Sequence, residues 1–459
     1  MLIFMVIMDI YDLIIPPFYL LLILFIAHKY KLKHQKKSKL FKYFFTGLLV
    51  KMIGAISLGL VYFYYYGGGD TINYFNTASA IVDLLIYEPE NFIYIYFGEP
   101  SITEHYLFGA NAVSTYWVGD KYAFFVAKCF TPFVLLTGKS YMATAIVIAS
   151  VCYLSVWRLY EVFANEFPHL YKQLAVPILF MPSVIFWGSG IMKDSITFSA
   201  ACLFVHGFYW FFVKRKRSLF FIGSVILAAI LLLSIKPYIL FALFPGSVLW
   251  LVALKVKTIK NPFFKIIIGP AIIAVGGIVV LAVLQNFSGN LGQYSIDKVF
   301  STASTSQQDL KQSYYGGNSF DIGDYEPTLL GLLSVSHKAV FATLFRPTVL
   351  DVRNIVMFIS ALENTFILIF CVYLLLKLKV LGFFKLIRAN PLVLFSFIFS
   401  IFFAVSVGVS IANFGTLVRL KIPCIPFFVA SLVIINAMRD EKILEKEKLR
   451  YQKELFKGK

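Results

Sequence analysis

Long runs of apolar residues alternate with short polar segments along almost the whole chain. A helix needs roughly 20 mostly apolar residues to cross the hydrocarbon core of a bilayer. The runs that approach this length cover residues 12–28, 44–65, 141–159, 174–191, 195–213, 218–234, 238–254, 264–285, 354–376, 391–411 and 418–437. The pattern therefore predicts an all-α integral membrane protein with about 11 transmembrane helices.

The apolar run at residues 122–137 is a further candidate for a span. It carries Lys128 and Pro132 in its interior, and a crossing here would place the basic loop Lys214–Arg217 on the side opposite to the other basic loops. We therefore predict a re-entrant or interfacial helix at this position, and expect the fold to hold one or two helices of this kind.

Basic residues gather in only some of the segments between the apolar runs. Most of the 42 lysines and arginines lie in the segments Lys29–Lys42, Lys214–Arg217, Lys255–Lys265, Lys377–Arg388 and Arg439–Lys459. Because Lys and Arg accumulate on the cytoplasmic side of a membrane protein, we expect the N-terminus outside and the C-terminus in the cytoplasm. Two long loops, at about residues 66–121 and 286–338, then face outside.

The composition excludes an ordinary soluble domain. Hydrophobic residues make up 59% of the chain and charged residues only 14%, against about 25% charged in soluble domains. The net charge of +18 could suggest nucleic acid, but the polar loops are too short to form a domain that binds it. We expect the basic loops to attract anionic lipid instead, so that the bilayer, and no nucleic acid, is a partner.

The chain shows no linker or internal repeat. We expect one polytopic membrane domain at residues 1–438 and a charged cytoplasmic helical tail at residues 439–459. The N-terminus lacks the basic segment and the cleavage site of a signal peptide, so the first apolar run is expected to stay as a span. The five cysteines lie far apart in apolar stretches, which favours packing roles over disulfides or metal ligands. No metal or cofactor is expected.

Ionisable residues in or beside membrane spans are costly and are candidates for function. The first group follows the span at residues 44–65. Gly67, Gly68 and Gly69 permit a close backbone approach to a ligand, and Asp70 and Tyr74 follow where the chain leaves the bilayer. Asp70 suits a carboxylate base or an acceptor for a sugar hydroxyl. The alternative is a flexible loop whose Asp70 caps the next helix.

A second group joins two apolar runs through a Gly-Ser-Gly break. Trp187 precedes the break, and Lys193 and Asp194 open the helix after it. Backbone N–H groups at a helix start, together with an ammonium, are typical of an anion site. The alternative is that Asp194 caps the helix while Lys193 reaches toward the interface. Lys236 lies in a tight outer hairpin, where it contributes to an anion site or serves as an interfacial anchor.

Further cations occur at the outer ends of late spans, where the positive-inside bias disfavours them. Arg346 has a planar fork suited to phosphate oxygens, and Arg353 and Arg419 lie near the same side. Glu363 and Asn364 lie about two turns inside a span. Glu363 needs a partner there, and a purely structural pair with Arg353 or Arg419 is the alternative to a chemical role.

These residues together predict a site for a pyrophosphate-bearing substrate. The proposed cationic lining consists of Lys193, Lys236, Arg346, Arg353 and Arg419. Asp70 and Glu363 are the carboxylates that face it, one of them placed to activate a hydroxyl.

Four motifs resemble those of a group of surface-polysaccharide polymerases. They are Gly67–Tyr74, Pro182–Asp194, Phe345–Pro347 and Gly415–Pro423. The group comprises the Wzy-type O-antigen or exopolysaccharide polymerases, which are similar to the wider GT-C class of membrane glycosyltransferases. The resemblance covers most of the chain through short motifs.

The resemblance implies transfer of a glycan from an undecaprenyl-diphosphate donor to a hydroxyl of a lipid-linked acceptor. The reaction would take place at the outer leaflet of a bacterial cytoplasmic (inner) membrane, without a nucleotide sugar, beside other polysaccharide-assembly proteins. It gives Asp70 the role of the acidic residue that acts on the acceptor, and Arg346 and Arg419 the role of holding the diphosphate. The large soluble outer domain of many GT-C enzymes is absent, which leaves polymerase, ligase and single-sugar transferase open.

Two other classes of function compete with the enzyme. A flippase for lipid-linked oligosaccharides, or a small-anion carrier, would line a path through the whole bundle with charge, whereas these charges concentrate at one leaflet. A non-catalytic subunit of an envelope assembly would explain the long outer loops, but it leaves Asp70, Arg346 and Arg419 without a task.

Overall fold

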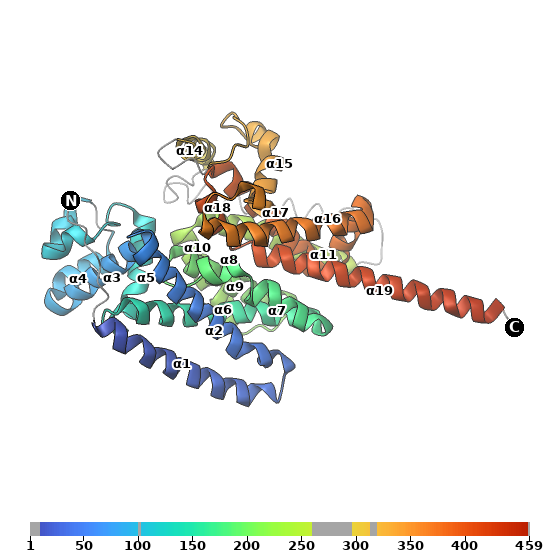
Figure 1. Ribbon diagram of the computed structural model, residues 1–459, viewed down its shortest axis with the longest axis horizontal. Coiled ribbons are helices and arrows are strands. Elements are labelled where there is room, and N and C mark those ends of the chain that lie inside the picture. The colour runs from blue at the N-terminus through green and yellow to red at the C-terminus, as the bar shows by residue number, and fades with distance from the viewer. Residues whose placement is uncertain (1–9, 100–101, 259–295, 313–318, 458–459) are drawn as a thin grey trace. The chain divides into compact units, whose positions relative to one another are not determined.

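The computed structural model describes residues 10–99, 102–258, 296–312 and 319–457, and this part of the chain is built from helices (Figure 1). Helices account for 84% of the structure, and no strand forms among the described residues. The nearest approach to a sheet there is a single bridge between Ser319 and Asn413. The prediction of an all-α protein is confirmed.

Seven helical segments are long and apolar enough to cross a membrane. They are Ile14–Gln35, Lys39–Tyr65, Tyr141–Glu166, Lys193–Val213, Pro237–Val256, Met357–Ala389 and Pro391–Ser410. Each coincides with a predicted span. The segments Phe414–Leu420 and Ile425–Glu441 form an eighth span if they are counted together, although they meet at a bend of 67°. The chain is therefore a multi-pass helical membrane protein.

The other predicted spans are shorter, broken or not described. The run at residues 218–234 forms α10 (Leu219–Ile235), which has 17 residues. The run at residues 174–191 divides into α7 (Tyr171–Leu179) and α8 (Pro182–Trp187). Pro182 contributes to this break because proline disfavours the helical conformation of the residue before it. The run at residues 264–285 lies outside the described residues, so the count of about 11 spans stays a prediction.

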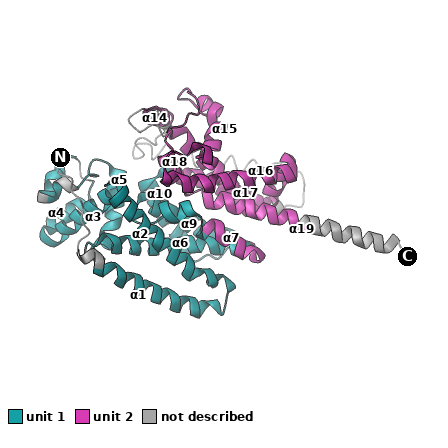
Figure 2. Ribbon diagram, viewed as in Figure 1, with its two compact units in different colours: residues 1–166, 179–237 teal, residues 167–178, 238–459 magenta. Residues whose placement is uncertain are grey.

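The chain divides into two compact units (Figure 2). Unit 1 comprises Met1–Glu166 and Leu179–Pro237, and unit 2 comprises Phe167–Ile178 and Tyr238–Lys459. Unit 1 contains α1 (Ile10–Gln35), α2 (Phe44–Leu60), α3 (Asp70–Tyr87), α4 (Pro89–Phe97), α5 (Lys121–Leu136), α6 (Tyr141–Glu166), α8, α9 (Lys193–Phe208) and α10.

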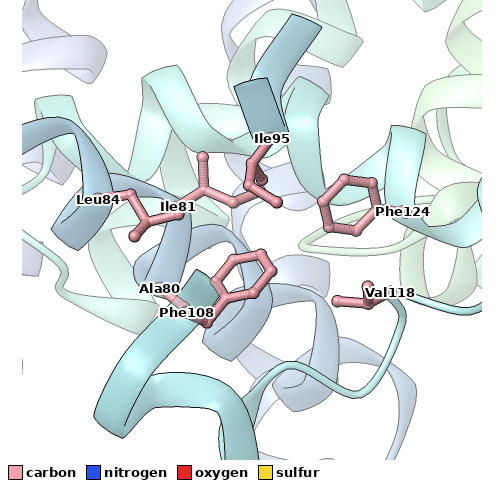
Figure 3. Close-up of a cluster of buried hydrophobic side chains, with 7 residues drawn as sticks. All are labelled: Ala80, Ile81, Leu84, Ile95, Phe108, Val118 and Phe124. Carbon is pink, nitrogen blue, oxygen red and sulfur yellow. The ribbon is translucent and has the colours of Figure 1, made fainter. Parts of the chain in front are cut away.

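Much of the predicted outer loop 66–121 is helical and has a core of its own. Helices α3, α4 and α5 and the 3-10 segment Ile102–Ser114 bury a set of apolar side chains between them (Figure 3). Its members are Ala80, Ile81, Leu84, Ile95, Phe108, Val118 and Phe124. Helix α5 is the run that we predicted to be re-entrant or interfacial. The carboxylate of Asp120 caps it by accepting hydrogen bonds from the amides of Tyr122 and Ala123.

Small residues allow the helices of unit 1 to pack closely. A Cβ atom on Gly54 of α2 would lie 2.2 Å from the carbonyl oxygen of Ile185, so α2 and α8 meet backbone against backbone. Gly190, in the turn between α8 and α9, has a positive φ of 75° and lies against Ala55 and Leu58 of α2. This packing fixes the Gly-Ser-Gly break against the adjacent span.

Unit 2 is built from most of α7 and from α11 (Pro237–Thr258), α14 (Ile296–Asp309), α15 (Leu329–Phe345), α16 (Ile355–Ala389), α17 (Pro391–Ser410), α18 (Phe414–Leu420) and α19 (Ile425–Lys457). Helices α15 and α17 are in close contact. A Cβ atom on Gly408 would lie 2.4 Å from the carbonyl oxygen of Ala339, and the Thr343 hydroxyl donates to the carbonyl of Ala404 at 2.8 Å. The apolar pattern does not predict α15, because His337 and Lys338 interrupt its apolar run.

Candidate functional site

The predicted site residues divide between the two units. Unit 1 holds the glycine turn, Asp70, Tyr74, Trp187, Lys193, Asp194 and Lys236, and unit 2 holds Arg346, Arg353, Glu363, Asn364 and Arg419. The structure links some of these residues inside each unit.

The glycine turn in unit 1 has the backbone shape that only glycine adopts readily. Gly67, Gly68 and Gly69 have φ values of 66°, 146° and 120°. Asp70 is the first residue of α3 and is half-buried, so its carboxylate also interacts favourably with the helix dipole. Tyr74 is fully buried and stacks on Trp117, with ring centroids 5.0 Å apart.

The break between α8 and α9 contains a buried ion pair. The ammonium of Lys236 lies 2.5 Å from Oδ1 of Asp194, whose side chain is fully buried. Lys236 is itself only 4% exposed, so it is a buried partner of Asp194 and not an exposed interfacial anchor. Trp187 ends α8 as a buried residue, and Lys193 is half-buried at the start of α9.

Lys51 is a buried cation that the sequence interpretation missed. It lies inside the span Lys39–Tyr65 and is 3% exposed. Its ammonium donates a hydrogen bond to the carbonyl of Val184 at 3.2 Å and lies 5.6 Å from the centre of the Phe198 ring. The sequence feature that could have identified it is its position as the single lysine of an otherwise uncharged run.

Arg346 is a cation of unit 2 that an ion pair holds in place. Its Nη2 and Nε atoms donate to the two carboxylate oxygens of Asp351 at 2.5 and 3.2 Å. The guanidinium carbon lies 4.8 Å from the centre of the Phe414 ring and 5.8 Å from that of Phe320. One edge of the fork is therefore occupied, and the Nη1 amino group has no hydrogen-bond partner among the described residues.

Asp351 holds Arg346 in this orientation. The amide and hydroxyl of Thr348 also donate to its carboxylate, at 2.7 and 3.0 Å. Burial raises the pKa of the Asp351 carboxyl, but the hydrogen bonds from Arg346 and Thr348 outweigh burial and bring the pKa below its ordinary value. Asp351 is thus a charged, fully bonded carboxylate that orients Arg346, which makes it a poor candidate for a base.

A buried polar network fixes the backbone beside Arg346. The fully buried Lys421 donates to the carbonyl of Arg346 at 3.0 Å and to Oδ1 of Asn364 at 2.6 Å. Asn364 in turn donates to the carbonyl of Pro347 at 2.9 Å. The carboxylate of Glu363, which is 8% exposed, favours the charged form of Lys421. Asn364 and Lys421 therefore both support the turn that carries Arg346.

The two remaining predicted cations are less enclosed. Arg353 is exposed in the segment between α15 and α16, and Arg419 is half-buried in the last turn of α18. Their roles as diphosphate contacts stay predictions.

A cleft of about 470 Å³ adjoins Arg346 in unit 2. Its lining residues are Asp321, Ile322, His337, Lys338, Phe341, Ala342 and Arg346. Only Arg346 belonged to the predicted set. The His337–Lys338 pair inside an apolar run is the sequence feature that could have identified the others. The sequence interpretation misses it because it assigns these two residues to the outer loop 286–338.

The described residues offer no cluster of three His, Cys, Asp or Glu side chains that could share a metal ion. No family model, curated protein or solved structure matches the chain. The resemblance to polysaccharide polymerases therefore rests on the four sequence motifs alone.

Proposed function

We propose that this chain is a membrane glycosyltransferase that polymerises or transfers lipid-diphosphate-linked glycan units at the outer leaflet of a bacterial cytoplasmic membrane. One observation carries most weight. Arg346 is a guanidinium fixed by Asp351 and flanked by Phe320 and Phe414, and it borders a cleft while its Nη1 group is unbonded among the described residues. An oriented guanidinium with a free edge suits the oxygens of a diphosphate.

The proposed topology has about 11 spans, with the N-terminus outside and the C-terminus in the cytoplasm. Helix α15 has 17 residues and carries His337 and Lys338 in its middle. We assign α15 and α5 as the re-entrant or interfacial helices, because a regular span rarely carries charged residues at its centre. The turn that holds Arg346 then faces outside, where a lipid-linked glycan would be presented.

Asp70 is the preferred base for the acceptor hydroxyl. It lies half-buried after the exposed glycine turn, where a sugar can reach it. Glu363 is buried beside Lys421, so it is better suited to balancing the charge of that lysine. Within unit 2, Arg353 and Arg419 are proposed as further diphosphate contacts. Within unit 1, Lys193 is proposed as an anion contact that the Asp194–Lys236 pair supports.

A transporter of lipid-linked oligosaccharides is the second candidate function. The buried Lys51 and the buried Asp194–Lys236 pair favour it, because charges inside a helical bundle are typical of transport pathways. A non-catalytic subunit of an envelope assembly is the third candidate, but no observation in the structure favours it.

The proposal predicts that loss of Arg346 weakens turnover of lipid-linked repeat units. Charge-assisted contacts to a diphosphate contribute about 1.5–3 kcal/mol each, so Arg346→Ala should lower turnover roughly tenfold to a hundredfold. Arg346→Lys should rescue activity only in part, because it keeps the charge but loses the planar edge. The measurement is elongation of lipid-linked repeats by purified protein, followed on gels.

Arg388→Ala is the matched control, since Arg388 is an exposed arginine in the last turn of α16. It should elongate like the wild type. Equal activity of all three variants would remove Arg346 from the mechanism.

A further inference from the structure

The cleft beside Arg346 has two walls. One wall is a face of α15 that carries Lys338 and Ala342, four residues or about one helical turn apart, and Arg346 follows directly after the end of this helix. The other wall is the segment that carries Asp321 and Ile322. Phe341 and Ile322 give the cleft an apolar part beside its cations.

The second wall is anchored to α18 and to the residues before it. The amide of Phe320 donates to the carbonyl of Ala412 at 2.7 Å, and Ser319 forms a bridge with Asn413. The Phe320 ring stacks on Phe414, with centroids 5.1 Å apart. Phe414 also faces the Arg346 guanidinium, so one aromatic pair positions both the wall and the cation.

Lys338 lies over a turn that brings it close to the second wall. Gly323 has a φ of 92°, and a Cβ atom at that position would lie 3.5 Å from the Lys338 ammonium. Glycine therefore provides the turn conformation, while a Cβ atom would be in ordinary van der Waals contact with the ammonium. The ammonium is held above the wall from which Asp321 enters the cleft.

The acids around the cleft already have partners. Asp321 lies 2.7 Å from the ammonium of Lys311 and accepts a hydrogen bond from the amide of Gly323 at 2.9 Å. Asp351 is engaged by Arg346. Lys338 is exposed and interacts electrostatically with the Asp321 carboxylate. The lining of the cleft therefore presents two cations, Lys338 and Arg346, against one carboxylate.

We infer that this cleft binds a diphosphate ester, with the Lys338 ammonium on one phosphate and the open edge of Arg346 on the other. Lys338 lies in α15 and Arg346 directly follows its end, about 12 Å further along the helix axis, and their long side chains can bracket a ligand that is itself extended. A monophosphate can satisfy only one of them fully. Phe341 and Ile322 cover the uncharged part of the ester.

This inference rests on the proposed function only for the natural ligand, which would be the lipid-linked diphosphate. The same chemistry occurs in the phosphate headgroups of anionic phospholipids, which are the second possible source. Lys338 thus becomes a substrate-binding residue that the sequence motifs do not include.

The test compares binding of farnesyl diphosphate and farnesyl monophosphate to the full chain in phosphatidylcholine nanodiscs. The wild type should bind the diphosphate at least tenfold more tightly. Lys338→Ala should lose that preference, because only Arg346 would remain to hold either ligand. Lys298→Ala removes an exposed lysine of α14 and should leave both affinities unchanged.

A second arm adds phosphatidylglycerol to the nanodiscs. Retention of the diphosphate preference supports the substrate site, whereas displacement of the ligand by that lipid would identify a headgroup site and overturn the inference. Equal affinities for the two farnesyl esters, or an unchanged preference in Lys338→Ala, would also overturn it. If binding behaves as expected but no glycan is elongated, the proposed function fails and the diphosphate cleft stands.

Discussion

At the scale of single residues, the cations of this protein fall into two physical classes. Lys236 and Lys421 are buried and bonded inside the protein, while Arg346 and Lys338 border a cleft. Buried ammonium groups lose hydration, so their partners stabilise them more than an exposed partner would. Only the second class can donate to a substrate without first breaking a structural contact.

The Asp194–Lys236 pair gives the first residue-scale prediction. Asp194→Asn leaves a buried ammonium without its ion-pair charge and should destabilise the protein by about 3–5 kcal/mol. Adding Lys236→Met should recover most of that loss, because both buried charges are then removed. Thermal unfolding in detergent, followed by size-exclusion chromatography, measures both variants.

Lys193→Met is the control for this pair, since the neighbouring Lys193 is only half-buried. It should change stability far less than Asp194→Asn. A single variant Asp194→Asn as stable as the wild type would show that the pair contributes little to the fold.

At the scale of helices, α15 connects the fold to the proposed site. It presents Lys338 to the cleft, is followed directly by Arg346, and packs against Gly408 of α17. The uncharged run at residues 391–411 predicted the helix Pro391–Ser410 closely. Helix α15 could not be predicted in this way, because the two basic residues at its centre indicate the end of the preceding loop.

Helix packing at Gly408 is open to a direct test. A Cβ atom there would lie 2.4 Å from the carbonyl oxygen of Ala339, so Gly408→Ala should force α15 and α17 apart. The expected cost is about 1–3 kcal/mol of stability, as for other overpacked interiors. The unfolding temperature of this variant should fall, and its affinity for the diphosphate should weaken.

Gly223→Ala in α10 is the matched control, because a Cβ atom there meets nothing within 4 Å. It should be neutral or stabilise by about 0.5–1 kcal/mol, since alanine favours a helix over glycine. An equal response of the two alanine variants would argue against a close α15–α17 contact.

At the scale of the whole molecule, apolar runs predicted the helical class and about 11 spans, of which seven coincide with helices long and apolar enough to cross a membrane. The partners inside the site required the structure. Arg346 and Asp351 are five residues apart, and their pairing is within reach of a sequence argument. Lys236 and Asp194 are 42 residues apart, and Lys421 and Asn364 are 57 apart. No local spacing encodes such pairs, because tertiary packing brings them together.

The topology predicts that both ends of α15 lie on the same, outer side of the membrane. Cysteines introduced at the exposed Glu326 and Leu350, in a chain without its native cysteines, should both react with an impermeant thiol reagent in intact cells. A cysteine at the exposed Lys37 should react only after lysis. Reaction of Glu326→Cys and Leu350→Cys on opposite sides would make α15 a span and overturn the proposed topology.

The central claim is that the protein catalyses glycan transfer between lipid-diphosphate-linked substrates. The most direct measurement is elongation of lipid-linked repeat units by the purified chain in detergent, where no second compartment exists and transport cannot be scored. The wild type should produce longer glycans and Asp70→Asn should produce none, although that variant should insert into the membrane and unfold at the same temperature as the wild type. A well-folded wild type that binds the substrate without lengthening it would contradict the account and favour the transporter.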